Sequence, residues 1–270
     1  MSNFEFRQDP LNRDWVIIAP LRSKRPDVAK GSEPVCPFCE GNEALTPREV
    51  YRLGKGRVNK PGWEIRVTPN KFPFAPIHEV VIHSPRHEEN FFTFSKSKLI
   101  KIFKVYRQRY LEHQSKGQVF IFHNFGKEGA ESLPHSHTQI AVIPSELTLR
   151  IPLMGIQENT FRATKYFNLF CPEASHWPAE VWIGPKARGE SFGSISPSQT
   201  EDLAKAVALV LKKLEKFLRP EFPFNFYIYP AGDWYLRIIP RLKVLGGFEI
   251  GTNVFVNTAD PVSTAKALGR

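Results

Sequence analysis

Residues 132–144 read SLPHSHTQIAVIP, a strand pattern that lies between two prolines. We predict a strand over residues 136–143, which Pro144 ends because proline offers no backbone N–H to a sheet. Alternate residues of a strand point to the same face, so His135, His137 and Gln139 share one face. Two imidazoles and an amide in one row predict either a reactive site or a polar face that supplies metal ligands without catalysis.

The elements around this strand occur twice along the chain. In the first copy we expect a strand at 79–83, a helix near 98–113, and strands at 119–122 and 136–143. In the second copy we expect a strand at 180–183, a helix from 196 to about 218, and strands at 225–229 and 235–239. Ser196-Pro197-Ser198-Gln199 is a capping box with proline at the first helical position, which sets where the second helix begins.

The spacing of the prolines that end these strands supports a duplication. Pro85 and Pro185 lie 100 residues apart, and Pro144 and Pro240 lie 96 apart. We therefore predict an α+β fold in which two strand–helix–strand–strand units form one large antiparallel sheet with packed helices. The predicted domains are 1–150 and 151–270, with 1–75 as loops and short strands wrapped on the core.

Composition narrows the class of protein. The chain has 270 residues, 41% apolar and 13% aromatic, which is enough for a sizeable core and excludes disorder. No apolar run approaches the roughly 20 residues of a membrane helix, and the start carries no signal-peptide pattern. Three cysteines are no disulfide framework, so we expect a cytoplasmic protein. The net charge of +10 predicts an anionic partner without specifying its kind.

A second chemical motif is Cys36-Pro37-Phe38-Cys39. Both thiolates of such a turn can bind one tetrahedral zinc ion, for which His87 and His135 are further candidate ligands. The alternatives are a redox pair, which the prolines around it disfavour, and two incidental cysteines. Cys171 has no partner in the sequence and reads as a small buried apolar residue.

The segment before the histidine row also suggests phosphate chemistry. Gly126 and Gly129 flank a loop whose backbone amides are predicted to face a phosphate. An imidazole is nucleophilic at neutral pH without a helper base, because its free pKa is near 6.5. Attack by such a group on phosphorus would give a phospho-histidine intermediate.

Together these motifs resemble the galactose-1-phosphate uridylyltransferase family of the histidine-triad superfamily. The resemblance covers nearly the whole chain, and its most specific element is Ser132-Leu133-Pro134-His135-Ser136-His137-Thr138-Gln139. Further matching segments are residues 7–10, 15–20, 22–26, 36–42, 69–73, 78–81, 84–87, 240–242 and 247–252. The resemblance implies two histidine-triad-like units, of which the second is degenerate.

The resemblance also implies roles for individual residues. His137 would attack the α-phosphorus of a nucleotide sugar, and Gln139 would stabilise the transferring phosphoryl oxygens. The implied ligands of a structural zinc are Cys36, Cys39, His87 and His135. The implied nucleotide, phosphate and sugar-phosphate contacts are Arg22, Arg25, Asn70, Asn124, Ser132, Lys243, Phe248 and Glu249, the last three partly across a homodimer interface.

The second copy lacks these groups in the sequence comparison. Counting back from the closing prolines matches His137 to Asp233 and Gln139 to Tyr235, and counting on from Pro185 matches His87 to Ala187. We therefore expect chemistry in the first copy alone. A second metal site that some relatives carry has no evident ligands here.

Three functions follow from these observations. The leading hypothesis is ping-pong transfer of a uridylyl group from UDP-glucose to galactose-1-phosphate or another hexose-1-phosphate. The second is a phosphorylase that passes the nucleotide to phosphate, from ADP-glucose or a dinucleoside polyphosphate. Lys71 stands where some relatives have an acidic residue that contacts the ribose, so the sequence does not determine which nucleobase the protein prefers. The third is a non-catalytic zinc protein that binds nucleic acid through its helix lysines, which does not explain His137 beside Gln139.

Overall fold

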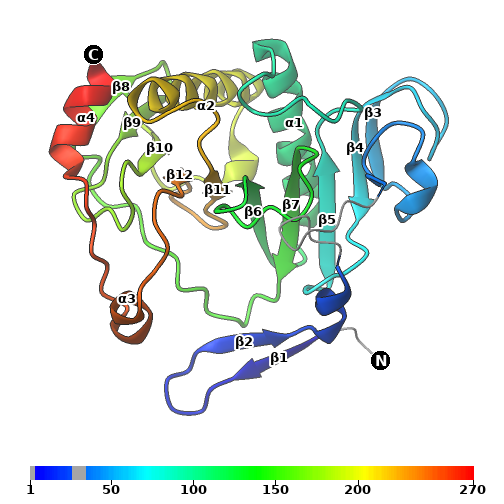
Figure 1. The fold of residues 1–270 in the computed structure, drawn as a ribbon, viewed down its shortest axis with the longest axis horizontal. Coiled ribbons are helices and arrows are strands. Elements are labelled where there is room, and N and C mark those ends of the chain that lie inside the picture. Colours follow the sequence, from blue (N-terminus) through cyan, green and yellow to red (C-terminus); the bar gives the residue numbers. More distant parts are fainter. Residues whose placement is uncertain (1–3, 26–34) are drawn as a thin grey trace.

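A computed structural model describes residues 4–25 and 35–270 of the chain (Figure 1). Its centre is a ten-stranded antiparallel sheet in the order β3-β4-β5-β7-β6-β11-β12-β10-β9-β8. The strands are β3 (Tyr51–Gly54), β4 (Trp63–Pro69), β5 (Ile77–Ile82), β6 (Gln118–Phe125), β7 (His137–Ile143), β8 (Thr160–Ala163), β9 (Phe167–Phe170), β10 (Val181–Pro185), β11 (Phe224–Ile228) and β12 (Leu236–Pro240).

The sheet consists of two halves with the same internal order. In each half the strand after the helix is the innermost, and the halves meet where β6 pairs with β11. Helices α1 (Lys96–His113) and α2 (Pro197–Phe217) pack against each other and against one face of the sheet, and a single apolar core runs beneath both. The predicted α+β duplication and its large antiparallel sheet are confirmed.

Helix starts follow local sequence signals. The Ser95 hydroxyl accepts from the Lys98 N–H and caps α1, while Ser196 and Gln199 form the predicted capping box of α2. Each cap satisfies amides that have no partner inside the helix. The two long helices therefore begin within two residues of the predicted positions.

Several smaller elements lie outside the duplicated units. The hairpin of β1 (Glu5–Gln8) and β2 (Trp15–Ile18) projects from the body near the N-terminus (Figure 1). A long segment after β12 carries α3 (Gly247–Thr252) and leads to α4 (Pro261–Gly269), which packs beside α2 and β8. Short 3-10 turns are found at Pro20–Lys24, Glu43–Leu45 and Phe192–Ser194. In the part of the chain that the structure describes, no helix is long and apolar enough to cross a membrane.

The strand register corrects the sequence match between the two copies. His137 pairs with Ile82, and the strand pair in the second half joins Arg237 to Trp182. Since Pro85 matches Pro185, Ile82 corresponds to Trp182, so Arg237 and not Asp233 occupies the place of His137. The count from the closing prolines fails because these prolines are not equivalent: His137 lies seven residues before Pro144, whereas Arg237 lies three residues before Pro240.

Candidate functional site

Four predicted ligands meet at one end of the first half. The ligand atoms of Cys36, Cys39, His87 and His135 all lie within 4.8 Å of one another. The Cys39 Sγ lies 3.4 Å from His87 Nδ1 and 3.6 Å from His135 Nδ1, and Cys36 Sγ is also 3.6 Å from His135 Nδ1. The turn and the two histidines, separated by about 50 and 100 residues of sequence, thus form one cluster.

The spacing of these atoms fits a tetrahedral metal ion. Zinc–sulfur and zinc–nitrogen bonds of usual length place neighbouring N and S ligands about 3.5 Å apart. His135 Nε2 lies 2.7 Å from the Ser84 carbonyl oxygen, to which it donates, so Nδ1 keeps its lone pair for the cluster. All four positions of a tetrahedron are filled by protein, which is the arrangement of a structural site.

His137 is held so that one ring nitrogen faces a cavity. Its Nδ1 lies 2.9 Å from the His135 carbonyl oxygen and donates to it, which leaves the Nε2 lone pair free. The residue is 6% exposed, and the Phe38 ring from the cysteine turn packs 5.2 Å from the imidazole. Burial lowers the pKa of His137 to about 4, so the ring is neutral and nucleophilic at pH 7.

The other face of β7 is fixed by a buried hydrogen-bond chain. Tyr106 OH donates to Thr138 Oγ1 at 2.6 Å and lies 2.8 Å from His83 Nε2, while His83 Nδ1 lies 2.9 Å from Ser136 Oγ. His83 therefore points toward the helices and away from the metal cluster. Because Ser136 and Thr138 alternate with His135, His137 and Gln139, this chain sets the rotation of the strand that carries the reactive row.

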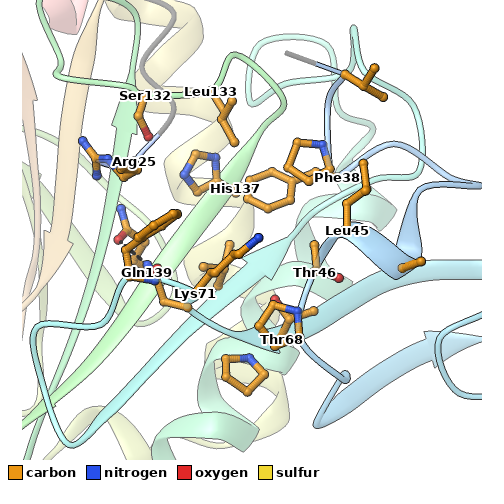
Figure 2. A pocket seen from close by; sticks show the side chains of 18 residues that line it. Arg25, Phe38, Leu45, Thr46, Thr68, Lys71, Ser132, Leu133, His137 and Gln139 are labelled. Carbon is orange, nitrogen blue, oxygen red and sulfur yellow. Dashed lines mark hydrogen bonds between the residues drawn. The ribbon is translucent and has the colours of Figure 1, made fainter. Parts of the chain in front are cut away.

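A cavity of about 340 Å³ opens in front of His137. Figure 2 shows Arg25, Ser132 and Gln139 gathered at one side, Phe38, Leu45 and Thr46 at the other, and His137 between them. The remaining lining residues are Val35, Pro37, Ala44, Pro47, Thr68, Pro69, Asn70, Lys71, Phe72, Val80 and Leu133. A polar, cationic end and a largely apolar end suit a ligand that joins phosphates to a flat ring.

Arginines from the N-terminal segment approach the polar end. Arg22 Nη1 donates to the Phe72 carbonyl at 2.8 Å, and its guanidinium lies 4.9 Å above the Phe74 ring. Burial and the neighbouring Arg25 lower the pKa of Arg22 to about 10, so Arg22 remains cationic at pH 7. The structure thus brings Arg25, Asn70, Ser132 and Gln139 to the cavity of His137 and places Arg22 just behind it.

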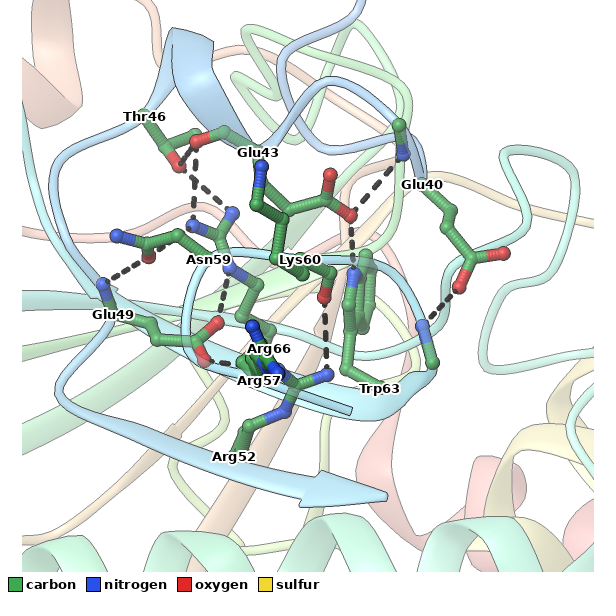
Figure 3. Close-up of polar contacts among 12 residues, drawn as sticks. Glu40, Glu43, Thr46, Glu49, Arg52, Arg57, Asn59, Lys60, Trp63 and Arg66 are labelled. Carbon is green, nitrogen blue, oxygen red and sulfur yellow. Dashed lines mark hydrogen bonds and ion pairs between the residues drawn. The ribbon is translucent and has the colours of Figure 1, made fainter. Parts of the chain in front are cut away.

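The apolar end rests on a buried ion pair (Figure 3). Arg66, which is 0% exposed, donates from Nε to Glu49 at 2.6 Å and from Nη1 to Thr46 Oγ1 at 2.8 Å. Glu43 accepts from the Trp63 indole N–H at 2.8 Å and from the Gly41 amide at 3.1 Å. This network ties the wall formed by residues 44–47 to strand β4, so the wall is positioned before any ligand binds.

The predicted phosphate loop is closed on itself. The Gly129 and Glu131 amides donate to the Gly126 carbonyl, the Ala130 amide donates to Lys127, and the Gly126 amide donates to the Glu131 carboxylate. A Cβ on Gly129 would collide with the Phe125 carbonyl, which explains that glycine without a ligand. The prediction that the amides of this loop face a phosphate is wrong for these four amides, because the tight turn uses them.

Asn124 lies at the end of β6 and meets the second half of the sheet. Asn225 Nδ2 donates to Asn124 Oδ1 at 2.8 Å and to the Gly129 carbonyl at 2.7 Å, and Arg241 Nη1 donates to Asn225 Oδ1 at 2.7 Å. The sequence near Asn225 does not indicate its contact with Asn124. Arg241, which donates to Asn225, lies in the matching segment 240–242 and was the only sequence feature that pointed to this region.

The remaining predicted residues lie in the segment that carries α3. Lys243 forms an ion pair with Glu249 at 2.9 Å, and Phe248 is 57% exposed. None of the three lines the cavity of His137. Within one chain, the structure therefore does not bring these three residues to the cavity of His137.

Comparisons with known proteins agree with this geometry. Residues 77–142 match the profile of the galactose-1-phosphate uridyl transferase N-terminal domain. The chain is 28% identical to ADP-glucose phosphorylase of Arabidopsis thaliana over 98% of its length and 92% of that protein. It is 25% identical to galactose-1-phosphate uridylyltransferase of Thermotoga maritima over 98% and 97%. The crystal structure of an Arabidopsis ADP-glucose phosphorylase with bound ADP-glucose superposes with a TM-score of 0.76 at 25% identity, covering 99% of both chains.

Proposed function

Because the chain belongs to the galactose-1-phosphate uridylyltransferase family, we propose that it moves a uridylyl group from UDP-glucose to a hexose-1-phosphate such as galactose-1-phosphate. The observation that carries this proposal is the free Nε2 of a neutral, buried His137 beside Gln139 and Arg25 in one cavity. That arrangement suits a covalent nucleotidyl intermediate, which divides the reaction into two half-reactions.

In the first half-reaction, His137 Nε2 forms a bond to the α-phosphorus. The bond from that phosphorus to the bridging oxygen breaks, and glucose-1-phosphate leaves with the electron pair. Arg25 and the Gln139 amide N–H groups stabilise the charge on the phosphoryl oxygens. In the second half-reaction the phosphate of the acceptor sugar attacks the same phosphorus, and His137 leaves as the neutral imidazole.

We propose zinc as the ion of the Cys36, Cys39, His87 and His135 cluster, because two thiolates and two imidazoles at tetrahedral spacing suit it. When bound, the ion supplies a structural crosslink. His135 lies two residues before His137, and Phe38 lies between the two cysteines. The cluster therefore fixes both the start of the reactive strand and the ring that packs against the nucleophile.

A second donor has its own supporting observations. The similarity to an ADP-glucose phosphorylase spans almost the whole chain. Lys71 lines the cavity where some family members would carry an acidic ribose contact. These features support a second candidate reaction, in which ADP-glucose is the donor and inorganic phosphate is the acceptor, through the same attack by His137.

The homodimer of the sequence prediction fits the surface of the α3 segment. Exposed large apolar side chains gather there: Leu242, Val244, Phe248, Ile250, Val254 and Val256. A second copy that covers this segment would remove the apolar surface from water and bring Lys243, Phe248 and Glu249 near the partner's cavity.

The experiment that tests the proposal supplies donors and acceptors in pairs. The protein is incubated with UDP-glucose or ADP-glucose, together with galactose-1-phosphate or inorganic phosphate, and the products are separated by chromatography. UDP-galactose from the first pair supports uridylyl transfer. ADP from ADP-glucose and phosphate, with no sugar exchange, supports the second candidate. No product from any of the four pairs would contradict both.

A further inference from the structure

His78 lies behind the cavity and is not one of its lining residues. It belongs to β5, is 4% exposed, and stands opposite Ala141 of β7, so its side chain is on the same face as Gln139. Its Nε2 is 3.0 Å from Gln139 Oε1, and its Nδ1 is 3.3 Å from the Phe74 amide nitrogen. The Phe74 ring packs 4.2 Å from the imidazole.

These contacts determine which ring nitrogen of His78 carries the proton. A backbone N–H can only donate, so His78 Nδ1 must accept from Phe74. A neutral imidazole has one N–H, which is then on Nε2 and donates to Gln139 Oε1. Burial and the nearby arginines lower the pKa of His78 to about 3, which keeps the ring neutral at every working pH.

Asn70 supports the same orientation of Gln139. Its Oδ1 accepts from the Phe72 amide at 2.9 Å, which places Nδ2 3.4 Å from Gln139 Oε1 and 3.2 Å from His78 Nε2. Because the Phe74 amide fixes the proton of His78 on Nε2, that nitrogen does not accept from Asn70, and both groups donate to Gln139 Oε1. Two donors therefore meet the Gln139 oxygen. The Gln139 Nε2 group is left to face the cavity and His137, where it can only donate.

We propose that His78 is a positioning residue for nucleotidyl transfer, because it fixes the Gln139 amide with its N–H groups toward the phosphoryl oxygens beside His137. An amide has nearly the same shape in either orientation, so without a donor behind it the oxygen can turn toward the phosphate and repel it. Removing a preorganised donor at a comparable site costs about 10²–10³ in rate. Misorienting that donor for part of the time should cost roughly 10-fold. The proposal rests on the proposed function of Gln139.

The test combines substitutions of His78 with removal of Gln139. His78→Leu removes the donor, whereas His78→Gln keeps an N–H near the position of Nε2. We expect His78→Leu to slow single-turnover formation of the nucleotidyl adduct about 10-fold with little change in donor affinity. His78→Gln should recover most of that rate. In a Gln139→Ala background, His78→Leu should cost less than about 2-fold.

Equal losses in both backgrounds would overturn the proposal, because they would mean that His78 acts through packing and not through Gln139. A wild-type protein that forms no adduct with either donor would remove the proposed function. In that case the side-chain amide signal of Gln139 in ¹⁵N–¹H spectra decides the question for His78. A shift in His78→Leu that is absent in His78→Gln supports the orientation, and an unchanged signal in both overturns it.

Discussion

The two halves of the sheet use equivalent strands in opposite ways. On β7, His137 and Gln139 face a cavity. On β12 the same face is filled: Tyr235 stacks 3.9 Å from the Trp182 ring, and Arg237 makes two hydrogen bonds to Glu180 at 2.7 and 2.8 Å. The segment after residue 150 covers this face, with Met154 packed against the same aromatic cluster.

This difference separates the groups that do chemistry from the groups that hold the fold. In the second half every polar group on the strand face has a protein partner, whereas in the first half His137 Nε2 has none in the described structure. The fold tolerates an open cavity in the first half and a filled face in the second, because one apolar core on the helix side of the sheet stabilises both halves. The first half thus carries the candidate site, and the second half stabilises the sheet in which that site lies.

The largest expected effect comes from the nucleophile. We expect His137→Ala to lower turnover by at least about 10⁴-fold, because the covalent route is lost. Asp233→Asn, at the position that sequence counting matched to His137, should leave turnover unchanged; asparagine tolerates the left-handed backbone there. Steady-state assays on both variants make the comparison, and equal losses would remove the distinction between the halves.

Loss of the metal site should have the second-largest effect. Cys39→Ala leaves three ligands, so we expect loss of bound metal and a melting temperature lower by roughly 10 °C. Cys171→Ala, in the second half, removes a buried thiol outside the cluster and should keep the metal. Elemental analysis and thermal unfolding measure both. Full metal content in Cys39→Ala would exclude the four-ligand site.

The ion pair of the second half should matter for stability and little for chemistry. Arg237→Leu leaves Glu180 buried without its cation, and we expect a loss of about 3–5 kcal/mol in the free energy of unfolding. The single-turnover rate of the molecules that remain folded should be within about 2-fold of wild type. Urea denaturation and active-site titration measure the two quantities. A large loss of rate in the folded fraction would show that the second half takes part in the chemistry.

Glu131 links stability to pH in the first half. Burial raises the pKa of Glu131 to about 7, and its Oε1 has no partner in the described structure. The folded state then binds more protons than the unfolded state between about pH 4.5 and 7, so stability falls as pH rises through this window. Glu131→Gln should be more stable than wild type at pH 8 by up to roughly 2 kcal/mol and similar at pH 4.5.

Urea denaturation of wild type and Glu131→Gln across this pH range gives the measurement. Glu128→Gln, a nearby surface carboxylate of the same loop, is the matched control and should follow the wild-type curve. Parallel curves for all three proteins would contradict the assignment to Glu131.

The smallest effect tests the contact between the halves. Asn225→Ala removes the amide that links Asn124 and the Gly129 carbonyl to Arg241. We expect KM for the nucleotide sugar to rise about 5-fold, which corresponds to one lost hydrogen bond of about 1 kcal/mol, with kcat nearly unchanged. An unchanged KM would confine the site to the first half.

The elements that were predicted from sequence are those with strong local signals. The capping box at Ser196 and the 3–4 spacing of apolar residues gave both long helices, and proline boundaries gave the inner strands. The edge strand β8 and its neighbour β9 were missed because each has only four residues, too few to show a period. The register error at Arg237 arose because pairing partners, not chain counts, determine equivalence in a sheet.

The residues of the candidate site were predicted from sequence motifs, whereas the residues that hold them in position were not. The four ligands that the family resemblance implies lie together, and His137 and Gln139, which strand alternation places on one face, line one cavity. The sequence alone does not indicate a role for His78, because its contact to Gln139 joins residues 61 apart. The loop at Gly126 was taken for a phosphate cradle because glycines in a tight turn and glycines beside a ligand look alike in sequence.

The central claim is that His137 carries the nucleotide during turnover. The most direct measurement is to react the protein with radiolabelled UDP-glucose or ADP-glucose, digest it with trypsin at alkaline pH, and sequence the labelled peptide by mass spectrometry. The account predicts an acid-labile nucleotidyl group on the peptide of residues 128–150, at His137 and not at His135. A label on any other residue, or none from either donor, would contradict it.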